Sequence, residues 1–118
     1  MSESYREITR GVSAALAPMR REQGELMNAF GALARAATQN GMLNAKTKEL
    51  IALAIGVAGH CDACIGFHAQ ALVKLGATRG EVEEALGVAV YMGGGPSLMY
   101  SANALSAFEE FAAAAQPA

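Results

Sequence analysis

Nine consecutive residues, His60 to His68, contain every cysteine and histidine of the chain. They read HCDACIGFH, so that two cysteines in a CxxC arrangement, Cys61 and Cys64, are followed four positions later by His68. Thiols and imidazoles can bind a metal, close a disulfide, or act as a nucleophile and its base. The spacing of the residues favours some of these chemistries over others.

Helical spacing would bring the two cysteines and the second histidine together. Side chains three or four positions apart lie on the same helical face, so Cys61, Cys64 and His68 would line one side of a helix that begins near Cys61. Free N–H groups and the helix dipole at such a start favour a thiolate. The sulfurs would be near enough to form a disulfide after a small adjustment. His68 could then take the proton from Cys64.

A carboxylate upstream of the cluster could complete a proton relay. If two helices form a hairpin around Gly59, then Glu49, ten positions before the turn, lies level with His68, nine positions after it. Small residues on the Glu49 face, such as Gly56, would allow the helices to approach closely. Glu49 could then orient His68, and His68 could activate Cys64, in the manner of a catalytic triad. The alternative is that Glu49 is an ordinary charge on a helix surface.

Zinc binding is the main alternative chemistry for the cluster. Cys61, Cys64, His60 and His68 can be counted as four ligands. His60 and Cys61 are adjacent, however, and a closed zinc site usually draws its second ligand pair from farther along the chain. We therefore predict no bound metal and no cofactor, and we interpret His60 as a solvated turn residue.

The composition narrows the classes of protein. With 118 residues the chain is expected to form one domain over residues 1–118. The net charge of −2 and the lack of a basic run argue against nucleic acid as a partner. No stretch approaches the roughly 18–20 apolar residues that cross a membrane. The first residues, MSESYREITRG, do not resemble a signal peptide, so we expect a cytoplasmic protein.

A surplus of apolar residues predicts self-association. Hydrophobic residues make up 53% of the chain and charged residues only 17%, which is more apolar area than so small a monomer readily buries. We expect a subunit contact around the last two helices, where Tyr91, Met92, Met99 and Tyr100 flank a glycine-rich break. The alternative is that these four side chains fill the core of the monomer.

Apolar residues recur at helical spacing nearly throughout the chain, which predicts an all-α fold: a single-domain antiparallel bundle of about six helices. The CxxC pair would lie at the start of a central helix. The expected boundaries are an end or kink near Pro18, a stop at residues 39–41, an N-cap at Asn44, a stop at Gly76, a capping box from Thr78 to Glu81, and a break at residues 93–96 before a last helix from about Ser97 to Ala113.

From residue 43 to about residue 105 the sequence resembles the alkylhydroperoxidase D (AhpD)-like branch of the carboxymuconolactone decarboxylase family. That branch carries a glutamate, eleven residues, CxxC, three residues and a histidine. Glu49, Cys61, Cys64 and His68 occupy these positions with every spacing matched. The surrounding stretch LNAKTKELIALAIGVAGHCDACIGFHAQALVKLGATRGEVEEAL and the following MGGGPS extend the resemblance.

The resemblance implies an all-α protein assembled as a homotrimer or homohexamer, with thiol-dependent, peroxiredoxin-type peroxidase activity. It implies that Glu49 and His68 relay a proton to Cys64, and that reduction of a hydroperoxide ends in a Cys61–Cys64 disulfide. A dithiol partner, such as a lipoyl or thioredoxin-like protein, would then reduce that bond.

Two alternatives come from other classes of protein. One is a carboxymuconolactone-type decarboxylase or isomerase, in which His68 and Glu49 transfer protons and the cysteines are incidental. The decarboxylase branch lacks the cysteine pair, which counts against this reading. The other is a non-catalytic oligomer whose assembly responds to closure of the CxxC disulfide.

Overall fold

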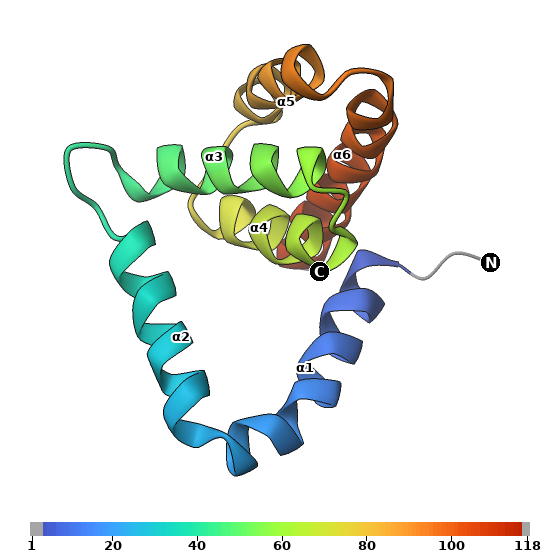
Figure 1. Ribbon diagram of the computed structural model, residues 1–118. Helices are drawn as coiled ribbons and strands as arrows, with labels where there is room; N and C mark the ends of the chain where they lie inside the picture. Colours follow the sequence, from blue (N-terminus) through green and yellow to red (C-terminus); the bar gives the residue numbers. More distant parts are fainter. Residues whose placement is uncertain (1–3, 117–118) are drawn as a thin grey trace.

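Six α-helices make up the part of the chain that the computed structural model describes, residues 4–116 (Figure 1). They are α1 (Tyr5–Glu22), α2 (Gly24–Thr38), α3 (Ala45–Ala58), α4 (Asp62–Lys74), α5 (Arg79–Gly93) and α6 (Gly95–Ala115). The described range contains no strand, which confirms the all-α prediction. None of these helices is long and apolar enough to cross a membrane.

Local hydrogen bonds account for several helix starts. The Asn44 side chain accepts a hydrogen bond from the backbone N–H of Thr47, so Asn44 is the N-cap of α3, as predicted. Thr78 and Glu81 form the predicted capping box at the start of α5. The last helix begins at Gly95, about two residues earlier than expected, because Pro96 is compatible with the first turn of a helix.

The sequence predicted that the first helix would either end or kink near Pro18, and the structure shows that it does not end there. α1 continues through the proline to Glu22. A proline inside a helix removes one backbone donor and crowds the preceding turn. Here the residue is exposed, and the Arg20 guanidinium donates a 3.1 Å hydrogen bond to the carbonyl of Ser13 in that turn. The exposed position leaves the carbonyl of Ala14, which loses its helical donor at Pro18, on the side of the helix open to solvent.

The core lies among α3, α4, α5 and α6, with the first turns of α1 packed against α4 and α6. α3 and α5 run side by side in the same direction. Lys46 and Glu81, near the starts of the two helices, form an ion pair of 2.7 Å, and Ala58 lies close to Gly93 at their ends. The side chains that are fully buried in the core include Leu53, Val57, Ile65, Leu72 and Val82.

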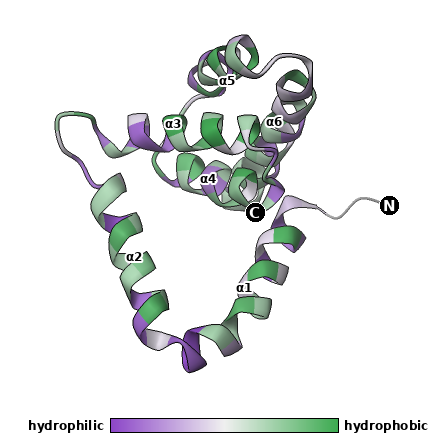
Figure 2. Ribbon diagram, viewed as in Figure 1, coloured by the Kyte–Doolittle hydropathy of each residue, from purple (hydrophilic) through white to green (hydrophobic). Residues whose placement is uncertain are grey.

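α1 and α2 depart from the close antiparallel packing expected of neighbouring helices. They form an open V that projects from the other four helices (Figure 1). α2 has no buried residue, although Figure 2 shows hydrophobic residues along much of its length. Isolated helices of this length are marginally stable in water and normally depend on packing of their apolar face. The described chain leaves that face of α2 open to solvent.

Most of the residues around the glycine-rich break lie on the surface. Tyr91, Met92 and Met99 are exposed to 84%, 75% and 63%, so the alternative that they fill the core is wrong for these three. Tyr100 is half-buried and packs against the core. The exposed side chains agree with a subunit contact in this region, which stays a prediction.

Candidate active site

A tight hairpin between α3 and α4 positions the candidate site residues. The chain reverses between Ala58 and Asp62, and the N–H of Cys61 returns a 3.0 Å hydrogen bond to the carbonyl of Gly56. Gly56 is buried, and a Cβ atom at this position would lie 3.1 Å from the Cβ of Cys64. The absence of a side chain therefore allows α4 to pack against α3 at Cys64, as the predicted hairpin requires.

Glu49 and His68 meet across this hairpin. The Nδ1 atom of His68 lies 2.6 Å from Oε2 of Glu49, which confirms the predicted register. Glu49 is only 8% exposed, so the alternative of an ordinary surface charge is wrong. A carboxylate only accepts hydrogen bonds, which assigns the imidazole proton to Nδ1 and leaves Nε2 as the nitrogen that can take a proton.

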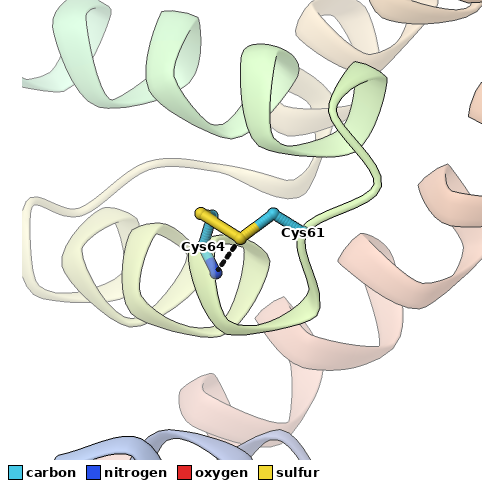
Figure 3. The surroundings of a disulfide bond; sticks show 2 residues. All are labelled: Cys61 and Cys64. Atoms are coloured by element: carbon cyan, nitrogen blue, oxygen red, sulfur yellow. Dashed lines mark hydrogen bonds between the residues drawn. A yellow bond between two sulfur atoms is a disulfide. The ribbon is translucent and has the colours of Figure 1, made fainter. Parts of the chain in front are cut away.

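Cys61 and Cys64 form a disulfide at the start of α4 (Figure 3). Their Cα atoms are 5.2 Å apart, within the ordinary range for this bond. Cys61 is the N-cap residue of the helix, and its sulfur accepts a 3.2 Å hydrogen bond from the backbone N–H of Cys64. When the disulfide is opened, that N–H and the helix dipole are placed to stabilise a thiolate on Cys61.

Both cysteines and His68 line one cavity of about 380 Å³. Its other walls include Ala52, Ile55 and Gly56 of α3, so the lining is apolar apart from the reactive groups. The predicted common face of the two cysteines and the histidine is therefore present. Glu49 does not line the cavity; it contacts the Nδ1 side of the histidine ring and is connected to the cavity only through that ring.

His60 does not line the cavity that contains the other three residues counted as possible zinc ligands. His60 is exposed, but its ring stacks on that of Tyr100, with 4.7 Å between the ring centroids. Its backbone has a positive φ of 56°, a conformation that histidine adopts more readily than most residues. Within residues 4–116, no three histidine, cysteine or acidic side chains are arranged to hold a metal ion.

Sequence reasoning missed a contact that reaches the residue between the cysteines. The Tyr5 hydroxyl donates a 2.8 Å hydrogen bond to Oδ1 of Asp62, and the backbone N–H of Tyr5 donates to Glu110. Burial, followed by the hydrogen bond to Asp62, raises the pKa of Tyr5 well above its ordinary value. Tyr5 and Asp62 are 57 positions apart, so no local spacing could have indicated this pair.

The Tyr5 hydroxyl should make stability depend on alkaline pH. Because its native pKa is raised, Tyr5 stabilises the fold fully below the unfolded-state pKa of about 10, and this contribution is lost as pH rises from there through the native pKa. We expect Tyr5→Phe to be less stable at neutral pH by about 0.5–1.5 kcal/mol, the usual value of one hydrogen bond. The difference from wild type should shrink above about pH 10.

Urea unfolding of the disulfide form at neutral and alkaline pH measures this effect. Tyr91→Phe is the matched control, because Tyr91 is 84% exposed. It should follow the wild-type pH dependence. A constant gap between Tyr5→Phe and wild type across the alkaline range would show that the hydroxyl does not titrate differently in the folded chain.

Comparison with known proteins finds the same fold and a shared family. The sequence profile of the carboxymuconolactone decarboxylase family matches residues 24–107, a range that includes the hairpin. The structure of apo-lpg0406 from Legionella pneumophila, a carboxymuconolactone decarboxylase family protein, is 60% identical with a TM-score of 0.90 and covers 92% of this chain and 96% of its own.

Two further proteins are more distant. TM1620 of Thermotoga maritima, a member of the same family described as a candidate for the antioxidative response, is 32% identical with a TM-score of 0.67 and covers 81% of this chain and 88% of its own. An uncharacterised protein of Cupriavidus necator is 44% identical over 87 residues, which are 74% of this chain and 77% of that protein. These similarities extend over most of the helical chain.

Proposed function

The chain belongs to the carboxymuconolactone decarboxylase family, and we propose that it acts there as a thiol-dependent peroxidase of the AhpD-like type. One observation carries the proposal. Cys61, Cys64 and His68 line a single cavity, while buried Glu49 is hydrogen-bonded to Nδ1 of the histidine. This arrangement supports the assignment of a cysteine as nucleophile, His68 as its base and Glu49 as the group that orients the base, beside a space that a small substrate can enter.

The first half of the proposed cycle oxidises Cys64. Nε2 of His68 takes the proton of the Cys64 thiol, and the thiolate attacks the terminal oxygen of a hydroperoxide. The O–O bond breaks as two electrons pass from sulfur to the peroxide. The leaving alkoxide takes the proton and departs as an alcohol, while Cys64 becomes a sulfenic acid.

The second half closes the disulfide. The Cys61 thiolate, stabilised by the N–H of Cys64 at the helix start, attacks the sulfur of the sulfenic acid. The S–O bond breaks, and its oxygen leaves as water after taking a proton. The product is the Cys61–Cys64 disulfide, the state of the pair in this structure.

An external dithiol would complete each turnover. One of its thiolates attacks a sulfur of the disulfide, and its second thiol then releases the mixed disulfide. Cys61 and Cys64 regain their protons, and the reductant leaves as a disulfide. A lipoyl or thioredoxin-like protein has this chemistry, and the cytoplasm, where dithiol reductants are maintained, is the compartment that we propose for the cycle.

Thiol stoichiometry tests the proposed activity. Fully reduced protein given one equivalent of an organic hydroperoxide should lose both thiols and release one equivalent of the corresponding alcohol. Protein already in the disulfide form is the control and should consume none. Unchanged thiols would contradict a peroxidase and favour proton-transfer chemistry at His68 and Glu49. Loss of thiols with a changed assembly but without alcohol would favour a redox-responsive oligomer.

A further inference from the structure

Tyr5 joins the start of α1 to both α4 and α6. The backbone N–H groups of Tyr5 and Arg6 donate hydrogen bonds of 3.2 and 2.9 Å to the two carboxylate oxygens of Glu110 in α6. The Tyr5 side chain is only 9% exposed, and its hydroxyl donates a 2.8 Å hydrogen bond to Oδ1 of Asp62. Tyr5 therefore ties the first residue of α4 to the first turn of α1.

α4 presents two different faces to its neighbours. On one face, a Cβ atom at Gly66 would lie 2.6 Å from the Cγ2 atom of Thr9, so the absence of a side chain allows α1 to pack closely there. Asp62 lies one turn before Gly66 and shares this face. The other face carries Cys64 and His68 and borders the cavity beside α3. The hydrogen bond from the tyrosine thus holds the carboxylate on the side of α4 that is turned away from the cysteine cavity.

The position of this carboxylate matters because Asp62 directly follows Cys61. Cys61 is the N-cap of α4, where the N–H of Cys64 and the helix dipole favour a thiolate. A carboxylate in the first turn of a helix can compete for the same free N–H groups, and its charge repels a neighbouring thiolate. The hydrogen bond from Tyr5 occupies one oxygen of the carboxylate, disperses part of its charge and keeps it on the α1 side.

We propose that Tyr5 is a positioning residue for the cysteine pair, which holds the Asp62 carboxylate away from Cys61 and so preserves the Cys61 thiolate. Its role rests on the proposed peroxidase cycle, in which that thiolate attacks the sulfenic acid of Cys64. Burial raises the pKa of Tyr5, so its hydroxyl stays protonated, and remains a donor, over the range in which thiols titrate. The match to the family profile begins at residue 24, so this control comes from a helix outside the matched range.

Alkylation of Cys61 in the Cys64→Ser variant tests the inference without peroxide. The thiolate is the nucleophile that reacts with iodoacetamide, so the rate against pH reports the ionised fraction of Cys61. Adding Tyr5→Phe should move the midpoint of this profile to higher pH, and the thiolate fraction below the midpoint should fall by about 2- to 10-fold, the effect of one hydrogen bond. Adding Asp62→Asn instead should move the midpoint to lower pH, because the negative charge is removed while an oxygen that can accept from Tyr5 remains.

A double variant separates positioning from a merely structural role. If Tyr5 acts through the carboxylate, Tyr5→Phe should cause no further shift once Asp62→Asn is present. Thr9→Val is the matched control, since it removes another buried hydroxyl from the contact between α1 and α4 and should keep the profile of the parent variant. The other titratable groups around the start of α4 are the same in every variant, namely His60, His68, Glu49, Tyr100 and Glu110.

Several results would overturn the inference. A midpoint for Tyr5→Phe that is unchanged or moved to lower pH would do so, as would an equal shift with and without Asp62→Asn. An unchanged midpoint for Asp62→Asn alone, or a shift for Thr9→Val as large as that for Tyr5→Phe, would also contradict it. Because no peroxide is used, failure here is distinct from failure of the proposed function, which the loss of thiols to hydroperoxide decides.

Discussion

Cys64→Ser should abolish peroxide consumption, whereas Cys61→Ser should still consume one equivalent and then stop. Cys64 lies one helical turn before His68 and shares its cavity, and a serine oxygen cannot be oxidised in place of the sulfur. In Cys61→Ser the sulfenic acid still forms on Cys64, but no second thiol resolves it. Single-turnover peroxide loss, with a sulfenic-acid trapping reagent and mass spectrometry, measures both results.

The two single variants serve as controls for each other, and Cys61→Ser/Cys64→Ser supplies the background rate. If Cys64→Ser consumed one equivalent and Cys61→Ser none, the order of the two cysteines would be the reverse of the one proposed. Catalytic turnover by either single variant would show that the disulfide is not an obligatory intermediate.

His68→Ala should slow single-turnover oxidation of the reduced protein by about 10²–10⁴-fold at neutral pH, the usual range for a general base. Part of the rate should return as pH rises, because hydroxide then forms the thiolate of a cysteine, which titrates at about pH 8.5 when free. The measurement is the rate of thiol oxidation between about pH 6 and 9. The recovery with pH separates loss of a base from a general loss of structure.

Glu49→Gln should fall between His68→Ala and wild type over the same pH range. The amide keeps a hydrogen-bonding group beside Nδ1 but removes the negative charge next to the imidazolium that the proposed proton transfer creates. Glu22→Gln is the matched control, since Glu22 is exposed at the end of α1 and should react like wild type. Wild-type rates for both Glu49→Gln and His68→Ala at every pH would exclude the relay.

Local sequence determined much of the fold and of the candidate site. Helix boundaries at Asn44 and Thr78 depend on side chains that bond to backbone groups only three positions away, so the residue types reveal them. The common face of Cys61, Cys64 and His68 follows from helical periodicity alone. To predict the pairing of Glu49 with His68, one further assumption was needed, namely that the two adjacent helices form a hairpin. Residues at nearly equal distances from a tight turn then lie opposite each other.

Tertiary structure decided what depends on residues far apart in the chain. The burial of Glu49 results from packing of α3 against α4, and the same glutamate on an isolated helix would be an exposed charge. The Tyr5–Asp62 hydrogen bond and the stacking of His60 on Tyr100 join segments of the chain whose relative placement no local pattern specifies.

The placement of α1 and α2 likewise followed from packing. Periodicity identifies an apolar face on α2 but does not reveal whether that face meets its own chain, and in this structure it does not. Short-range hydrogen bonds and helical geometry can be read from residues a few positions apart. The surface that each helix covers depends on the competition among all apolar faces for burial, and that competition is settled only when the whole chain packs.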